Sequence, residues 1–263
     1  MNTYVILSIL IVIIIIIIFR LPENFEDSHT KKGINSFDCY MYINLDHRKD
    51  RKEQITKELN KMNIPPNKTI RIDAVHEKYN GHIGCAKSHI KALKLAKEKK
   101  YKNVVIFEDD FVFTENEDVV NKKINKFLDY FGNDWDIVQL TAHYKSLKNI
   151  ENLDDIKKVN RASTSSAYII QSKFYDKLIN NITQAKEKME EEMIIFHRKN
   201  KNKKKYSTSY ALDQHWNSLQ NKSKWYIFHP FIGKQSGSSS IMSRNLEGFY
   251  NFIGNTKYHK INV

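Results

Sequence analysis

From Asp38 onward, short apolar runs alternate with longer segments in which apolar residues recur at helical spacing. The run 104–107 is continuously apolar, which is typical of a central parallel strand buried on both faces. Ile55, Leu59 and Met62 instead lie at i, i+4 and i+7, on one side of a helix. The predicted strands are 39–45, 69–75, 104–107, 136–140, 167–170 and 225–231, and the predicted helices cover 55–62, 85–99, 120–131, 173–182 and 185–198.

This alternation predicts βαβ units and therefore an α/β fold with a mostly parallel, Rossmann-type sheet flanked by helices. In such a sheet the functional groups gather at the carboxyl ends of the strands. The 263 residues, less an apolar N-terminal segment, leave room for one sizeable domain, which we place at 37–263. The hydrophobic share of 41% and the charged share of 28% are those of an ordinary globular protein.

The N-terminal segment 4–19 is apolar and interrupted only by Ser8. Its length is slightly below the ~20 residues of an untilted membrane span, a mismatch that costs little. No basic residue precedes it and no small-residue cleavage site follows it, so an uncleaved anchor is favoured over a signal peptide. We predict a transmembrane anchor at 1–21, a polar stalk at 22–36 and a single-pass membrane protein. The flanking charges favour a cytosolic domain only weakly, so the side of the membrane stays open.

The net charge of +13 raises the question of nucleic-acid binding. The lysines are not interleaved with aromatic residues in a stacking pattern, and the dense basic run 198–205 is typical of a solvated loop. We therefore expect no nucleic-acid partner, although a basic groove would attract a nucleotide diphosphate. Cys39 and Cys85 are too few for a disulfide framework and are interpreted as buried free thiols.

The strongest chemical signal is the triplet Glu108-Asp109-Asp110 directly after the buried run 104–107. Three adjacent carboxylates repel one another, so the arrangement is costly unless a cation holds them together. Hard oxygen ligands of this kind suit Mn²⁺ or Mg²⁺. The alternative is an exposed acidic turn that caps the following helix.

Two segments upstream of the triplet carry further polar candidates. Arg48 and Arg51 are three positions apart at a helix start, where two arginine forks suit a phosphate; the alternative is a solvated helix start with Asp50 paired locally. Gly84 opens the next helix, and a glycine there lets a ligand approach the backbone amides. His89 follows on the same helix, with a satisfied structural histidine as the alternative.

Four segments closely resemble glycosyltransferase family 25, which covers bacterial lipopolysaccharide-type galactosyltransferases and collagen galactosyltransferase domains. They are INLDHRKDR (43–51), GCAKSHIKAL (84–93), VVIFEDDF (104–111) and SSAYIIQSKFYDKL (165–178). The resemblance runs from about residue 39 to 241, and the spacing between the second and third segments is its most specific part. It implies a GT-A fold, a nucleotide diphosphate-sugar donor and an inverting mechanism.

The same resemblance assigns roles to individual residues. It implies that Glu108, Asp109 and Asp110 carry the metal, and His229 is the candidate for completing the coordination. The segment 210–216 is similar to the family's acidic segment facing the acceptor. The residues expected to bind the nucleotide-sugar donor are Asn44, Leu45, Arg48, Arg51, Gly84, Ser88 and His89.

Asp213 is our choice for the base that an inverting transfer needs to take the acceptor's proton. The alternative is an acid stabilised by the dipole at a helix N-terminus. The segment 233–241 is similar to the family's terminal region, but Ser239-Ser240-Ile241 lacks the family's Asp there.

The predicted activity is metal-dependent transfer of a hexose, galactose or glucose, from a UDP-sugar to a hydroxyl of a glycan, lipid or protein acceptor. Mn²⁺ or Mg²⁺ is the expected cofactor. The alternative is a non-catalytic, membrane-tethered relative that binds a sugar or nucleotide without turnover. The two sugars differ at one hydroxyl, and pocket contacts of that kind leave no short motif.

Overall fold

The computed structural model describes residues 33–199 and 209–236, and the chain divides into the units Met1–Lys32 and Gly33–Val263. The predicted anchor, most of the predicted stalk and Ser239-Ser240-Ile241 lie outside the described residues. Within the described part, no helix is both long and apolar enough to cross a membrane. The anchor at 1–21 therefore stays a prediction.

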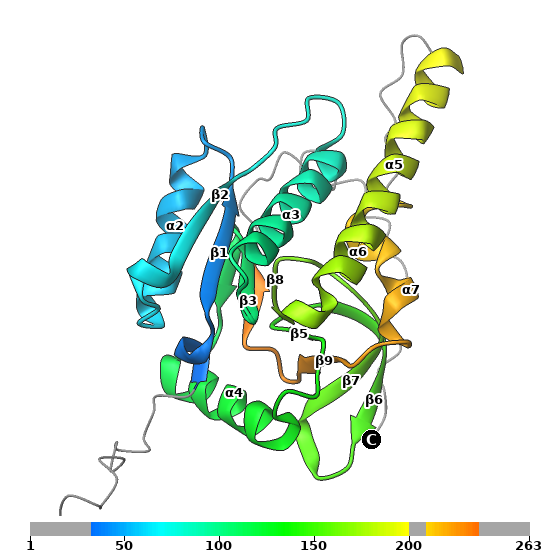
Figure 1. The fold of residues 1–263 in the computed structure, drawn as a ribbon. Helices are drawn as coiled ribbons and strands as arrows, with labels where there is room; N and C mark the ends of the chain where they lie inside the picture. Colours follow the sequence, from blue (N-terminus) through cyan, green and yellow to red (C-terminus); the bar gives the residue numbers. More distant parts are fainter. Residues whose placement is uncertain (1–32, 200–208, 237–263) are drawn as a thin grey trace, which may run out of the picture. The chain divides into compact units, whose positions relative to one another are not determined.

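The domain is built on one mixed sheet of eight strands in the order β2-β1-β3-β8-β5-β9-β7-β6 (Figure 1). The pairs β2–β1, β1–β3 and β5–β9 are parallel, whereas β3–β8, β8–β5, β9–β7 and β7–β6 are antiparallel. The α/β fold with flanking helices is confirmed, and the sheet, predicted to be mostly parallel, is mixed. The strands are β1 Cys39–Asn44, β2 Thr69–Asp73, β3 Asn103–Glu108, β5 Ile137–Gln139, β6 His143–Ile150, β7 Leu153–Ser163, β8 Ala167–Gln171 and β9 Trp225–Phe228.

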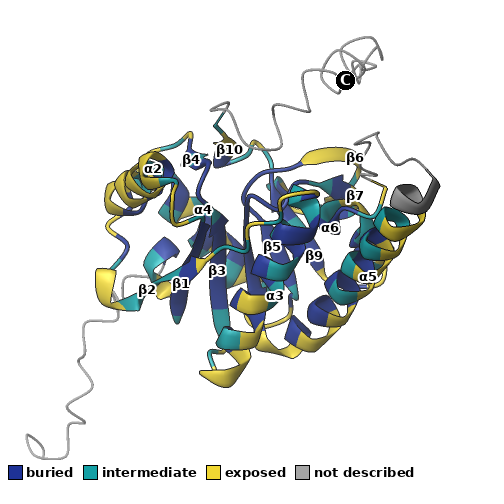
Figure 2. Cartoon of the chain, turned by 90° about the horizontal axis from the view of Figure 1, so that it is seen from above, coloured by how far each residue is buried: buried dark blue, intermediate teal, exposed yellow. Residues whose placement is uncertain are grey.

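Helices cover both faces of this sheet, because successive side chains of a strand point to opposite sides. Met41 and Ile106 lie in a buried cluster with residues of α3 and α5, while Tyr40 and Val105 lie in a second cluster with residues of α2 and α4. Figure 2 shows the strands buried between helices whose outer faces are exposed. The helices are α2 Lys49–Lys61, α3 Gly81–Glu98, α4 Glu117–Phe131, α5 Tyr175–Lys199, α6 Leu212–His215 and α7 Asn217–Gln220, with 3-10 turns at Gly33–Ser36, Pro66–Lys68 and Ser172–Phe174.

Local signals explain where these helices begin and end. The side chain of Asn80 accepts a hydrogen bond from the backbone N–H of His82 and so caps α3, and Asn116 caps α4 in the same way. Gly132 ends α4 with a φ of +53°, a conformation that costs a glycine little. The α2 helix ends before Pro65, which cannot continue a helix.

Three details of the predicted pattern were wrong. The helices predicted at 173–182 and 185–198 are one helix, α5, because Ile182, Ala185 and Met189 continue the same buried stripe across Thr183 and Gln184, neither of which breaks a helix. The hairpin of β6 and β7 was not predicted, because β6 is largely exposed and lacks an alternating apolar pattern. The strand predicted at 225–231 ends at Phe228, and a further strand follows, β10 Gly233–Gln235, paired with β4 Phe111–Phe113.

The sheet brings its polar strand ends to one edge. The parallel strands β1 and β3 end there at Asn44 and Glu108, and β5 ends there at Gln139 because it is antiparallel to β8, which is itself antiparallel to β3. For the same reason β8 begins at this edge, with Ala167 opposite Phe107. The candidate site lies at this edge.

Candidate active site

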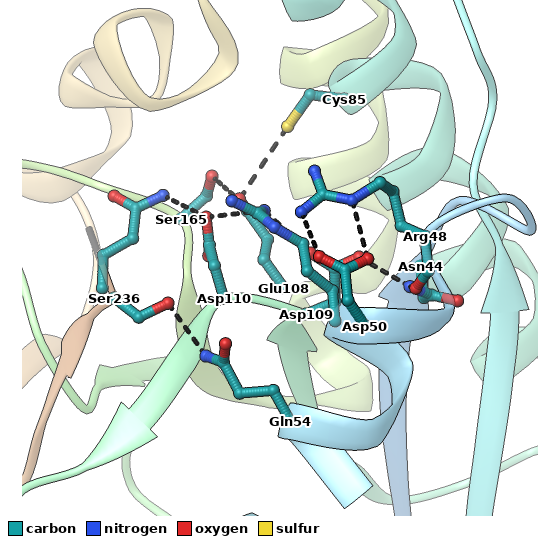
Figure 3. Close-up of polar contacts among 12 residues, drawn as sticks. Asn44, Arg48, Asp50, Gln54, Cys85, Glu108, Asp109, Asp110, Ser165 and Ser236 are labelled. Atoms are coloured by element: carbon teal, nitrogen blue, oxygen red, sulfur yellow. Dashed lines mark hydrogen bonds and ion pairs between the residues drawn. The ribbon is translucent and has the colours of Figure 1, made fainter. Parts of the chain in front are cut away.

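The acidic triplet spans the last residue of β3 and the turn into β4, and its carboxylates divide into two groups (Figure 3). Asp109 and Asp110 both accept hydrogen bonds from Arg51, whose Nη1 lies 3.1 Å from Oδ1 of Asp109 and 3.1 Å from Oδ2 of Asp110. Glu108 instead accepts from Ser165, with 2.5 Å between Oγ and Oε1. The three carboxylates are therefore adjacent in sequence but contact two different sets of partners.

Arg51 supplies the positive charge that three neighbouring carboxylates require. Its side chain is only 7% exposed, and α2 carries it under the turn that holds Asp109 and Asp110. The sequence predicted a phosphate-binding fork at this position, whereas the structure pairs the guanidinium with the chain's own carboxylates. A buried ion pair of this kind keeps both partners in place, because removing either leaves an uncompensated charge.

The turn between β1 and α2 holds three more of the predicted donor-binding residues, Asn44, Leu45 and Arg48. Asn44 is buried, and its side-chain amide donates to Oδ2 of Asp109 at 2.7 Å. The backbone carbonyl of Leu45 accepts from the N–H of Arg48 and closes the turn. Arg48 forms an ion pair with Asp50 at 2.6 Å, which is the local pairing considered as the alternative.

Burial and mutual repulsion change the acidity of the triplet. Burial and the nearby charge of Glu108 raise the pKa of Asp110 to about 7, and burial also raises the pKa of Asp109. Burial acts to raise the pKa of Glu108, but the interactions with His89, the hydrogen bond from Ser165 and the charge of Arg51 together outweigh it, so that this pKa is lowered. Glu108 therefore carries the most stable negative charge of the three.

Asp109 and Asp110 fit a divalent cation. Within the described residues, Oδ1 of Asp110 is buried and accepts no hydrogen bond, so its lone pairs face no donor. Carboxylate oxygens are the ligands that Mg²⁺ and Mn²⁺ prefer. The ring of His229, which follows the end of β9, contacts Tyr144 and Phe231, and no contact among the described residues joins it to the triplet, so its role as a ligand stays a prediction.

Gly84 and Ser88 hold α3 against the loop that follows β2. A Cβ on Gly84 would lie 2.4 Å from the carbonyl oxygen of Val75, so the close approach that this glycine permits is made by the chain's own backbone. The hydroxyl of Ser88 accepts from the N–H of Val75 at 2.9 Å and donates to the carbonyl of Gly84 at 2.7 Å. These contacts of Gly84 and Ser88 are with other residues of the chain.

Gly84→Ala should therefore lower the free energy of unfolding by about 1–3 kcal/mol, the usual cost of forcing atoms into a filled space. Urea denaturation followed by circular dichroism would measure it. Lys94→Ala on the exposed face of the same helix is the matched control and should change the stability by less than about 0.5 kcal/mol. Equal free energies of unfolding for the two variants would show that the loop after β2 moves aside at little cost.

His89 is fully buried and has a partner for each ring nitrogen. Nδ1 lies 3.0 Å from the hydroxyl of Tyr168, and Nε2 lies 3.3 Å from Oε1 of Glu108. The side chain therefore contacts the acidic triplet directly, and it also fits the alternative of a satisfied histidine.

Asp213 is joined to the triplet by the three residues between β7 and β8. Its Oδ2 accepts from the N–H of Thr164 at 2.9 Å; next along the chain, Ser165 donates to Glu108, and the carbonyl of Ser166 accepts from the N–H of Glu108 at 2.8 Å. Thr164 has a φ of +84°, which is rare for a β-branched residue and marks a backbone held by its surroundings. This loop fixes Asp213 and Glu108 relative to each other.

Sequence reasoning missed several residues of this site. Ser165 lies in one of the segments that resemble the family, 165–178, but nothing in the sequence marks it as the partner of Glu108. Gln235, whose amide donates to Oδ2 of Asp110 at 3.0 Å, lies 125 positions from that residue. His82 is close enough to Asp213 and Glu108 for both to act on its pKa, which burial lowers. A partner so distant in sequence leaves no local pattern.

The family match covers the central part of this site. Residues 67–195 match the sequence model of Glycosyltransferase family 25 (LPS biosynthesis protein). The chain contains a glycosyltransferase family 25 domain. The matched residues include α3, the acidic triplet and the loop at Thr164, and they leave Asn44, Arg51, Asp213 and β10 outside. The protein is thus a glycosyltransferase, as the sequence segments predicted.

Solved structures show weak likeness to the family 25 domain. A glycosyltransferase involved in the glycosylation of the major capsid of PBCV-1 is 8% identical over 80% of this chain and 98% of its own, with a TM-score of 0.41. A197 from STIV is 15% identical over 74% of this chain and 83% of its own, with a TM-score of 0.41. Mannose-1-phosphate geranyltransferase from Thermus thermophilus is 7% identical over 72% of this chain and 72% of its own, with a TM-score of 0.43. All three scores lie below 0.5, so the assignment rests on the family match. No curated protein matches the chain.

Proposed function

We propose that the family 25 domain transfers a hexose, galactose or glucose, from a UDP-sugar to an acceptor hydroxyl with inversion and with the help of a divalent cation. The observation that carries this proposal is the gathering of carboxylates at one sheet edge. Asp109 and Asp110 come from the end of β3, Asp213 comes from α6, and the loop at Thr164 connects the two sides. An inverting transfer needs a base for the acceptor, and a cation beside the donor would help the diphosphate to leave.

Asp109 and Asp110 are the proposed ligands of Mn²⁺ or Mg²⁺. When bound, such an ion would offset the charge of the diphosphate leaving group. Arg51 keeps the two carboxylates close together and adds positive charge beside them. Asn44 restrains Asp109 from the other side through its amide.

Asp213 is the proposed base. Burial raises its pKa, and the negative charge of Glu108 acts in the same direction. A carboxylate with a raised pKa accepts a proton more readily than one at the ordinary value, provided that it is ionised at the working pH. Asp213 would take the proton of the acceptor hydroxyl as that oxygen attacks the anomeric carbon.

A donor screen tests the proposal. The full-length protein in detergent would be incubated with UDP-galactose, UDP-glucose and, as a control, GDP-mannose, with Mn²⁺ or with EDTA. We expect release of UDP from one of the two UDP-hexoses only when Mn²⁺ is present. Binding of UDP without release from any donor would favour a non-catalytic relative, and release that is equal with EDTA would contradict the metal dependence.

A further inference from the structure

A second cluster of possible metal ligands lies behind the acidic triplet. The thiol of Cys85, the imidazole of His89 and the carboxylate of Glu108 each offer one ligand atom, and these atoms all lie within 4.8 Å of one another. Cys85 and His89 are four positions apart on α3 and therefore share one side of the helix. Among the described residues, these three side chains form the group of histidine, cysteine and acidic residues whose ligand atoms lie this close together. Neither Asp109 nor Asp110 belongs to the group.

The separations in this cluster are close to those of a tetrahedral site. Zinc bonds of about 2.0–2.3 Å place tetrahedral ligand atoms about 3.3–3.8 Å apart. Nε2 of His89 lies 3.3 Å from Oε1 of Glu108, and Sγ of Cys85 lies 3.9 Å from the same oxygen. The remaining pair is within 4.8 Å, so shifts of about 1 Å or less would bring all three atoms to one ion.

The donor types select the class of ion. A thiolate and an imidazole suit Zn²⁺ and related transition metals, whereas Mg²⁺ and Mn²⁺ prefer oxygen ligands. This cluster therefore differs in chemistry from Asp109 and Asp110, which offer oxygen alone. Binding would release the proton of the Cys85 thiol, since the thiolate is the ligand.

The surroundings of the cluster resemble an outer shell that orients ligands. The hydroxyl of Tyr168 lies 3.0 Å from Nδ1 of His89, so an N–H at Nδ1 can donate to it and leave the lone pair of Nε2 for an ion. Ser165 donates to Oε1 of Glu108, the same oxygen that faces His89 and Cys85. His89 is fully buried, whereas the side chain of Glu108 is 17% exposed and leaves a path to solvent.

We propose that Cys85, His89 and Glu108 bind one Zn²⁺-class ion with a fourth position open to water. The ion joins α3 to the end of β3 and fixes the carboxylate of Glu108 at the sheet edge. This site is separate from the Asp109 and Asp110 site and does not depend on the proposed transfer reaction.

Cobalt binding tests the proposal without measuring activity. The full-length protein in detergent, stripped with EDTA and dialysed, would be titrated with Co²⁺. We expect one equivalent to bind with the charge-transfer absorption of a cobalt–thiolate bond in the near ultraviolet, and Zn²⁺ to displace it. Cys85→Ser should abolish this absorption, while Cys39→Ser, which changes the other free thiol, should retain it.

Two further variants keep the test decisive. Tyr168→Phe should weaken Zn²⁺ binding by about 10- to 100-fold, the usual cost of losing an outer-shell partner, with the protein still folded by circular dichroism. Asp110→Asn should keep the cobalt absorption, which separates this site from the proposed donor site. Absence of the absorption in the wild type, its survival in Cys85→Ser, or unchanged Zn²⁺ affinity in Tyr168→Phe would overturn the proposal.

Discussion

Asp213→Asn is expected to lower turnover by about 100-fold or more, the range for loss of a general base. Asparagine keeps the size of the side chain and can still accept from the N–H of Thr164, so the loop contact survives while the proton acceptor is lost. Affinity for UDP should change little, because the base contacts the other substrate. Steady-state kinetics with the donor found in the screen, and titration of UDP, would measure the two effects.

Asp38→Asn is the matched control for this prediction. Asp38 also accepts a backbone hydrogen bond, from the N–H of Lys102, but it lies before β1, at the opposite edge of the sheet. Its replacement should leave turnover near the wild-type value. Near-native turnover of Asp213→Asn would instead assign Asp213 to holding the loop at Thr164.

The pH dependence of turnover follows from the same residue. Asp213 must be ionised to accept a proton, and burial raises its pKa above the ordinary value of 3.8. As the pH is lowered, turnover of the wild type should therefore begin to fall at a pH above the pKa of an exposed aspartate.

The second large effect concerns the cation. UDP should bind the wild type far more tightly with Mn²⁺ than with EDTA, because carboxylates alone repel a diphosphate and an intervening cation reverses the sign of that interaction. Asp110→Asn should remove most of this difference, about 100-fold or more, since losing a direct ligand should cost at least as much as losing an outer-shell partner. Isothermal titration of UDP into both proteins, with and without Mn²⁺, would measure it.

Glu108→Gln provides the comparison within the triplet. The Glu108 carboxylate faces Ser165 and His89 rather than Arg51, so its loss should reduce the effect of Mn²⁺ on UDP binding less than Asp110→Asn does. If the triplet only caps a turn, the variants would unfold at lower temperature without any change in ion dependence. Equal UDP affinity in all conditions would remove the proposed cation site.

The sequence by itself determined the elements that frame the site. The continuous apolar run of β3 and the helical spacing on α2 and α3 reflect burial, which local composition records directly. The parallel pairing of β1 and β3 then places Asn44 and Glu108 at one edge, as predicted. The need for a cation beside three carboxylates also followed from electrostatics alone.

Only the tertiary structure decided which groups meet at that edge. Arg51 pairs with carboxylates 58 and 59 positions away, and Thr164 reaches Asp213 across 49 positions. Glu108 and Asp110 face different partners because the chain turns between them, and a turn's direction is fixed by packing rather than by the residue types. Gly84 likewise leaves room for the backbone at Val75, which lies next to it only after α3 packs against the sheet. Contacts of this kind depend on the relative positions of whole elements, and those positions result from the burial of many side chains together.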